Sequence, residues 1–169
     1  MTLDAALNAI EPMLRTSPVG AWVRHSQWAW PMLESLHFMG MSVLIGTIGL
    51  FDLRLLGFAR GIPYAALHRL IPLGIAAYTL NLATGFCFLS GTPDQYLFNP
   101  AFRFKVTFMF VAGLNVVFFY TRVFRRLEAL GTEAPPPIGA RVAGAVSLTM
   151  WIGVMSAGRL LTFFRPPYV

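Results

Sequence analysis

The sequence predicts an all-α membrane protein, in which an amphipathic N-terminal segment precedes an up-down bundle of four membrane-spanning helices. Hydrophobic residues make up 56% of the 169 residues and charged residues only 12%, whereas soluble domains carry roughly 25% charged residues. The mean hydropathy is +0.63. Each apolar stretch is near or above the ~20 residues that a helix needs to cross a bilayer. We place the spans at about 32–56, 67–91, 102–125 and 140–164.

The N-terminal segment, residues 1–30, is predicted to lie in the membrane interface, ahead of a transmembrane domain over 31–169. Its apolar residues repeat at helical spacing, as in an amphipathic helix, at Leu3, Leu7, Ile10 and Leu14. A second short helix is predicted to begin at Ser17-Pro18, a capping residue followed by proline. Tryptophans suit the headgroup layer, and they occur here at Trp22, Trp28 and Trp30. The segment has no basic start and no continuous apolar run, so we expect no cleavable signal peptide.

The connections between the spans are short, which predicts that successive helices pack as antiparallel neighbours. Small residues occur in every span, and Ser42 with Gly46 forms a pair at the spacing that lets helix backbones approach closely.

Lysine and arginine are concentrated on the cytoplasmic side of membrane proteins, and this bias predicts the orientation. The larger set lies on the side of the loops after the first and third spans, at Arg54, Arg60, Arg69, Arg122, Arg125, Arg126 and Arg141. The smaller set lies on the opposite side, at Arg15, Arg24, Arg103, Lys105 and Arg165. We therefore expect both termini outside the cytoplasm. The formal charge of +6 follows the membrane pattern, so nucleic acid is not an expected partner.

Ionisable groups inside apolar spans are costly and are the first candidates for function. At the outer ends of the spans the candidates for holding a haem or a quinone are His37, Glu34, Lys105, Arg159 and Met155. A neutral imidazole can ligate a haem iron or a copper ion, or hydrogen-bond a quinone. The alternatives are a histidine that bonds to a neighbouring group, and basic side chains that extend to the interface. Arg159 can also pair with Glu34 across the bundle.

A b-type haem held by two histidines needs both at one depth on facing helices. His37 and His68 lie at opposite ends of their spans, and His25 precedes the first span, so this pairing is not supported. A methionine partner for His37 is possible at Met109 or Met155.

A second group of polar residues is predicted to be structural, namely Asp52, Arg54, Asn81 and Asn115. We expect Asp52 and Arg54, with Arg122 and Arg125, to form an anchoring layer held by ion pairing. The two asparagines are placed to hydrogen-bond between helices. A single cysteine, Cys87, excludes an internal disulfide and a multi-cysteine metal site. No nucleophile–base pair, metal-ligand spacing or nucleotide motif is present, so the sequence does not indicate an enzyme.

Several motifs resemble a family of small bacterial four-helix membrane proteins of unknown function. They are ESLHFMG at 34–40, DLRLLG at 52–57, NPAFRFK at 99–105, GLN at 113–115 and WIGVMSAGR at 151–159. The family is more remotely similar to CopD-like and cytochrome b561-like proteins. The resemblance implies the four-span fold and a bacterial inner membrane, with periplasmic termini on our orientation, and it implies no activity. Members often carry a histidine where this chain has Tyr120.

Three functions remain open. The protein can be a non-catalytic anchor or accessory component of a larger membrane assembly or homo-oligomer. It can be an electron-transfer protein that binds a b-type haem or a quinone near His37. It can be a small transporter or metal-handling protein, although no internal repeat and no midplane charge support this.

Overall fold

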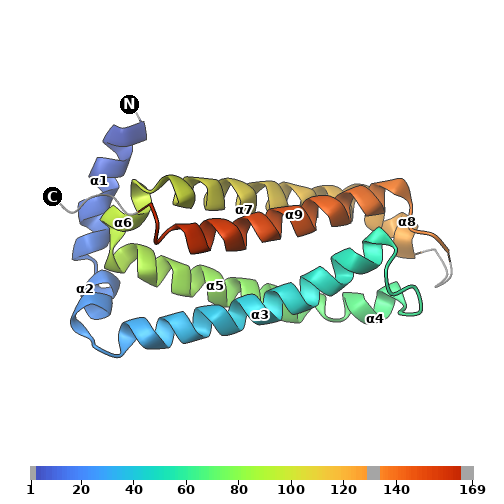
Figure 1. Cartoon of the computed structure of the whole chain (residues 1–169), viewed down its shortest axis with the longest axis horizontal. Coiled ribbons are helices and arrows are strands. Elements are labelled where there is room, and N and C mark those ends of the chain that lie inside the picture. The colour runs from blue at the N-terminus through green and yellow to red at the C-terminus, as the bar shows by residue number, and fades with distance from the viewer. Residues whose placement is uncertain (1–2, 129–133, 165–169) are drawn as a thin grey trace.

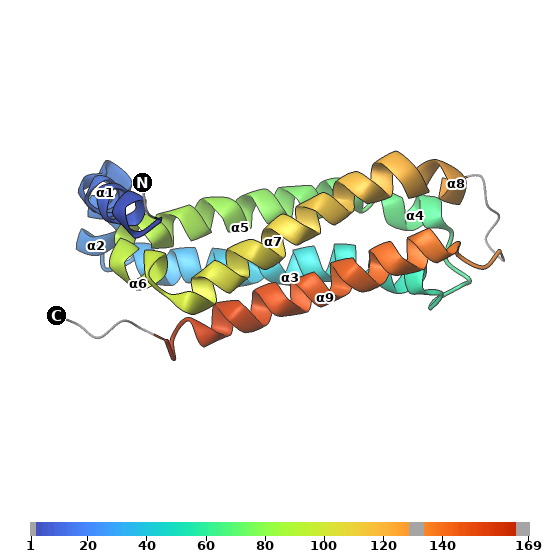
Figure 2. The same cartoon turned by 90° about the horizontal axis from the view of Figure 1, so that it is seen from above.

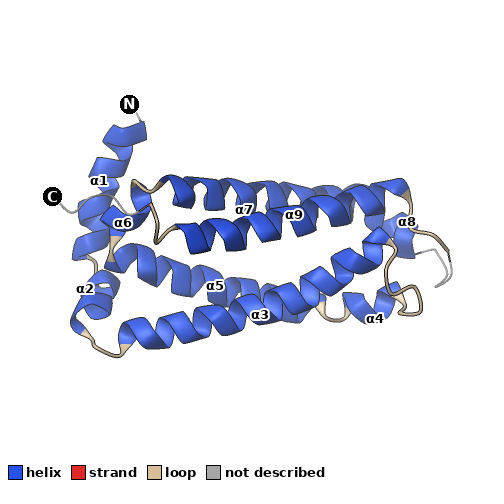
Figure 3. Ribbon diagram, viewed as in Figure 1, coloured by secondary structure: helices blue, strands red, loops and turns tan. Residues whose placement is uncertain are grey.

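The computed structural model describes residues 3–128 and 134–164. Every regular element in these two ranges is helical (Figures 1 and 3), which confirms the predicted all-α class. The elements are α1 (Leu3–Thr16), α2 (Pro18–His25), α3 (Ala29–Leu56), α4 (Tyr64–His68), α5 (Ile71–Gly91), α6 (Pro93–Leu97), α7 (Pro100–Phe118), the π-helix η1 (Phe119–Val123), α8 (Phe124–Glu128) and α9 (Ile138–Leu160).

Four helical stretches are long and apolar enough to cross a membrane, so the chain is a multi-pass membrane protein. They are Ala29–Leu56, Tyr64–Gly91, Pro100–Leu127 and Ile138–Leu160. Each begins and ends within a few residues of its predicted span. The end of α3 shows why the boundaries are readable, because Gly57 has a φ of +98° and this left-handed conformation stops the helix.

The two short N-terminal helices are present as predicted, and they pack across one end of the bundle (Figure 1). The Ser17 hydroxyl accepts a hydrogen bond of 3.0 Å from the Gly20 backbone N–H and so caps α2. A salt bridge of 3.0 Å between Arg15 and Asp94 joins α1 to α6. The Arg24 guanidinium donates to the carbonyl of Gly91 at the end of α5, at 3.2 Å. These contacts fix the N-terminal helices to the ends of the spans.

The spans pack as two pairs, α3 with α5 and α7 with α9, and α3 also packs against α9. Helices α5 and α7 scarcely touch, although a short connection joins them. The predicted packing of these two successive spans is therefore limited to the end that carries α4 and α8, where His68 contacts Tyr120 and Phe124. The reason lies in the connection, because helix α6 lies between the end of α5 and the start of α7 and contacts both. The start of α7 is held instead to α9, where the Asn99 amide donates to the Leu161 carbonyl at 3.1 Å.

Small residues make the close contacts between spans, but not the pair expected from spacing. A Cβ on Gly74 would lie 2.9 Å from Thr47 on α3, and one on Gly144 would lie 2.9 Å from the Asp52 carbonyl. Ser42 and Gly46 are exposed instead, and a Cβ on Gly46 would meet no atom within 4 Å. The two residues have the spacing typical of closely packed helices, but they lie on a side of α3 that faces away from the bundle.

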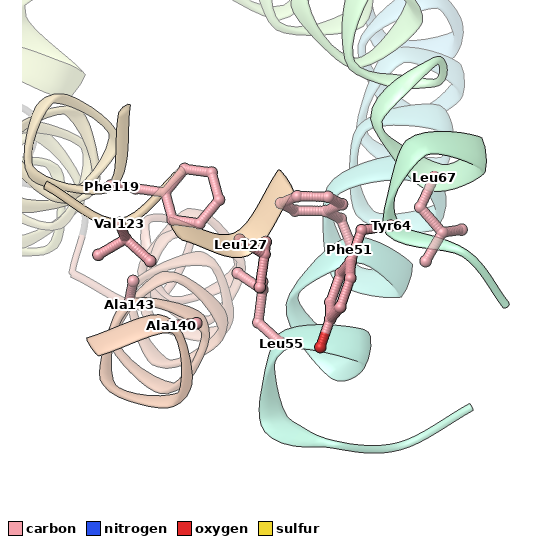
Figure 4. Packing of buried hydrophobic residues seen from close by; sticks show 9 residues of the cluster. All are labelled: Phe51, Leu55, Tyr64, Leu67, Phe119, Val123, Leu127, Ala140 and Ala143. Carbon is pink, nitrogen blue, oxygen red and sulfur yellow. The ribbon is translucent and has the colours of Figure 1, made fainter. Parts of the chain in front are cut away.

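The largest buried cluster lies at the end of the bundle that carries α4 and α8 (Figure 4). Aromatic and aliphatic side chains from α3, α4, η1, α8 and α9 fill this end, namely Phe51, Leu55, Tyr64, Leu67, Phe119, Val123, Leu127, Ala140 and Ala143. The π-helix turns Phe119 and Val123 into this cluster, where both are buried. We call this region the packed end.

Candidate functional site

All of the predicted cofactor-binding residues line a single cavity at the opposite end of the bundle, where α1, α2 and α6 lie. The cavity holds about 300 Å³, and its walls include Glu34 and His37 on α3, Lys105 on α7, and Met155 and Arg159 on α9. We call it the outer cavity. The sequence places these residues at the outer ends of their spans. The structure brings their side chains, from three helices, to one place.

A second cavity of about 260 Å³ adjoins the outer one and extends toward the middle of the spans. We call it the inner cavity. The two share part of their walls, namely His37, Met41, Gly85, Phe102, Lys105, Val154 and Met155. The remaining lining of the inner cavity is mostly apolar, and it includes Tyr78 and Trp151, whose rings meet edge to face at 5.9 Å. The site is therefore polar at its outer part and apolar within.

His37 is held in one orientation by a neighbouring span. Its Nδ1 lies 2.7 Å from the Thr84 hydroxyl on α5, and its ring meets Phe88 edge-on at 5.7 Å. The Thr84 hydroxyl also lies 2.8 Å from the Leu80 carbonyl, to which it donates. A hydroxyl has one hydrogen to donate, so Thr84 accepts from His37. We therefore assign the hydrogen to Nδ1, which leaves the lone pair of Nε2 available to a ligand.

Lys105 is the cation that reaches furthest into the site, since it lines both cavities. Its ammonium lies near Gly158 on α9, 3.7 Å from where a Cβ on that residue would be. Within the described ranges it has no salt bridge and no hydrogen-bond acceptor. An ammonium group is costly inside a membrane when it is unpaired. The geometry therefore offers a strong hydrogen-bond donor to whatever fills the cavity.

Glu34 and Arg159 lie at the polar mouth of the outer cavity, and both are exposed. The possible ion pair between them is not formed among the residues that the structure describes. The Arg159 side chain is exposed, and it also lines the outer cavity.

The other histidine within the spans belongs to the packed end. His68 Nε2 lies 3.1 Å from the Tyr120 hydroxyl, and its ring packs on Phe124 with centroids 4.6 Å apart. It is thus separated from His37 by most of the bundle, as expected from sequence. His25 is exposed on α2 and is not part of either cavity wall.

The partners of Arg54 differ from those expected. It is fully buried and donates to the carbonyls of Ile62 at 2.8 Å and Arg60 at 3.3 Å, and to the Tyr64 hydroxyl at 3.0 Å. Its guanidinium also lies 4.0 Å above the Tyr64 ring. These contacts tie the end of α3 to the loop that follows.

Asp52 is buried beside Ser147 of α9, whose hydroxyl hydrogen-bonds to it. The expected ion pairing with Arg54 is absent among the described residues. The reason is helical geometry, because residues two apart point to different sides of a helix. Arg122 and Arg125 are exposed and do not complete a buried layer.

The two asparagines behave differently. Asn115 donates to the Ala143 carbonyl at 2.9 Å, which confirms a hydrogen bond between α7 and α9. The amide of Asn81 lies against Gly40, about 3.0 Å from where a Cβ would be, and neither of its polar atoms has a partner in the described part of the chain. The expected bond from Asn81 between helices is therefore not formed.

Sequence reasoning missed Thr84 and Asn99. Thr84 has no local signature, because only the packing of α5 on α3 brings it to His37. Asn99 did have a signal: an asparagine before Pro100 is a typical helix start, and its side chain accepts from the Ala101 N–H at 3.0 Å.

The fold and the cavities define a four-span helical membrane protein with a ligand-sized site between its spans at one end. Comparison of the chain with protein-family models, with curated proteins and with solved structures finds no match.

Proposed function

We propose that this protein binds a lipid-soluble quinone, with the quinone ring between His37 and Lys105. The observation that carries the proposal is the Lys105 ammonium, which lines both cavities and has no partner among the described residues. A carbonyl oxygen on an otherwise apolar ring would accept a hydrogen bond from it, and the apolar walls would hold the ring.

The two polar groups favour different redox forms of the same ring. Lys105 can only donate, so it suits the carbonyl oxygen of the quinone. The assigned tautomer of His37 presents an acceptor at Nε2, which suits the hydroxyl of the quinol. A site with one donor and one acceptor can hold both forms, as electron transfer requires. A site that holds both redox forms fits an accessory subunit of a larger membrane assembly. A second protein must then exchange electrons with the bound ring.

The size of the site favours a quinone over a haem. A single benzene ring fills an apolar cavity of about 150 Å³, so cavities of about 260 and 300 Å³ suit one substituted ring better than a four-ring macrocycle. A six-coordinate haem held by His37 would also need a second ligand, and the methionines in the wall that the two cavities share are Met41 and Met155.

We further propose that the cavity end faces the periplasm of a bacterial inner membrane. The basic residues at the packed end outnumber those at the cavity end, and this bias sets orientation. Gln95→Cys, combined with Cys87→Ala, should react in intact cells with a thiol reagent that does not cross the inner membrane. Labelling only after the cells are opened would contradict the orientation.

The binding proposal is tested with purified protein in lipid nanodiscs and a dimethoxy-methyl-benzoquinone that carries a ten-carbon tail. We expect saturable binding, and about a tenfold to hundredfold loss for Lys105→Met, since a hydrogen bond to a charged group contributes about 1.5–3 kcal/mol. Arg122→Met, which removes an exposed cation far from the cavity, should bind as the wild type does.

Two results would overturn the proposal: no saturable binding by the wild type, or equal binding by Lys105→Met and the wild type. An absorbance spectrum before and after dithionite provides an independent check. A Soret band with sharp reduced bands would identify a haem in the site instead of a quinone.

A further inference from the structure

The walls of the inner cavity come from all four spans, and two of these, α5 and α7, scarcely pack against each other. Helix α5 contributes Leu82 and Phe86, helix α7 contributes Val106 and Met109, and α3 and α9 complete the lining. Among the described helices, α5 packs on α3 and α2, whereas α7 packs on α9. Figure 1 shows the pair α3/α5 apart from the pair α7/α9 at the end with α1 and α2, and α3 approaching α9 toward the other end.

The inner cavity is therefore open on one side. Leu82, Phe86 and Val106 line it and are nevertheless 45%, 50% and 48% exposed, and they lie on α5 and α7, the two helices that scarcely touch. Figure 2 shows α7 passing α5 diagonally and not lying along it. Because these residues lie within two membrane spans, the surface around them faces hydrocarbon and not water.

We propose that the ligand enters and leaves sideways from the bilayer through this opening, and that its apolar tail lies between α5 and α7 while its ring lies at Lys105. The inference rests on the proposed function and specifies the ligand as a tailed, membrane-dissolved quinone. The arrangement of charge supports this occupant. The cation and the histidine lie at the inner side of the opening, whereas the rim consists of apolar side chains that match an isoprenoid or alkyl chain.

The tail gains little from leaving lipid, because lipid tails are as apolar as the residues of the rim. The opening should therefore permit the tail without adding affinity. At equal concentration in the membrane, the wild type should bind the tailed quinone and the same ring without a tail within about threefold of each other.

The test is a tryptophan in the opening. Val106→Trp should weaken binding of the tailed quinone at least about tenfold, because two bulky groups would compete for one space, and it should weaken binding of the tail-less ring much less. Val116→Trp is the matched control: Val116 lies on the same helix, is 51% exposed and does not line the cavity. It should change neither affinity.

The outcomes separate the two proposals. If neither quinone binds the wild type, the proposed function fails and the opening loses its ligand. If the tail-less ring binds well and the tailed one binds much more weakly to the wild type, a lipid chain or a second copy closes the opening, and the lateral route is overturned. Equal effects of Val106→Trp on both quinones would overturn it as well, since the residue would then belong to the ring site. Leu82→Trp, on the opposite wall, repeats the test independently.

A cross-linking variant tests directly whether a second copy of the chain covers the opening. Val106→Cys in a Cys87→Ala background removes the native free cysteine and places a thiol at the rim. Efficient disulfide-linked dimers in nanodiscs would show that another copy covers the opening, and this would contradict the proposal. A monomeric product under oxidation is the expected result.

Discussion

The two ends of this bundle solve the same packing problem in opposite ways. At the packed end, α3 approaches α9, and rings such as Phe51 and Phe119, which meet edge to face at 5.7 Å, fill the space between the helices. At the other end the helix pairs diverge, and two adjoining cavities occupy the space. Because protein interiors are normally close-packed, the proposed function assigns this unfilled space to a ligand.

Each end also contains a cation inside a span, and the comparison of their partners is informative. Arg54 is fully buried and satisfies its donors with backbone carbonyls and Tyr64. Lys105 has no such partner in the described ranges, and it faces a cavity. A guanidinium holds several donors in a fixed planar arrangement, whereas an ammonium is a compact charge on a flexible stem. The charge is the same, and only the surroundings separate a structural role from a binding role.

The largest expected difference between the ends is in stability. Phe51→Ala should lower the free energy of unfolding by about 3 kcal/mol, because Phe51 is 4% exposed and its removal leaves a cavity. Phe86→Ala, at the rim of the inner cavity, should cost less than about 1 kcal/mol. Unfolding in mixed micelles, followed by the loss of helicity, measures both. Equal losses would contradict the division into a packed end and an open end.

Removal of the two cations should affect the stability of the bundle differently. Arg54→Met should cost about 2 kcal/mol, because the carbonyls of Ile62 and Arg60 lose a charged donor. Lys105→Met should cost nothing or stabilise the bundle, because it removes an unpaired charge from a span. The same unfolding assay, without added quinone, compares them. A loss for Lys105→Met as large as that for Arg54→Met would show that Lys105 is structural.

The sequence predicted the positions of the charged residues better than it predicted their partners. The four spans follow from composition and length, and the separation of charged residues into two levels follows from their position within each span. For this reason Glu34, Lys105 and Arg159 were correctly placed at one end. The partners of each residue were not predictable, because they depend on how the helices are rotated and paired. Asp52 and Arg54 were expected to interact, and they point to different sides of α3.

The contact between His37 and Thr84 shows the same limit. Both residues are visible in the sequence, but 47 residues separate them, and nothing local indicates that α5 presents Thr84 to α3. The near absence of contact between α5 and α7 was also unpredictable, since the short connection between them favoured a packed pair. The opening of the inner cavity depends on this pairing, so sequence reasoning found the candidate residues without the space between them.

Substitution of two glycines tests which helix surfaces are packed, with a smaller expected effect on stability. Gly144→Ala should destabilise the bundle by about 1–3 kcal/mol, since its Cβ would lie 2.9 Å from the Asp52 carbonyl, which is backbone and cannot easily move. Gly46→Ala should be neutral or stabilise by up to about 1 kcal/mol, because its surroundings are open and alanine favours a helix. Unfolding midpoints in micelles compare the two. Destabilisation by Gly46→Ala would indicate that this face packs against another protein copy.

The smallest expected effect concerns the orientation of His37. Thr84→Val keeps the shape of the side chain and removes the acceptor for Nδ1, so it should cost about 1 kcal/mol. Thr79→Val is the matched control, because Thr79 lies on the same helix, donates to a backbone carbonyl at 2.9 Å and has no histidine beside it. The imidazole nitrogen resonances of His37 provide the decisive measurement. They should report one tautomer, with the hydrogen on Nδ1, in the wild type and in Thr79→Val, and a mixture in Thr84→Val. A single unchanged tautomer in all three proteins would show that Thr84 does not set the state of Nε2, and the acceptor that the site offers to a quinol would then need another cause.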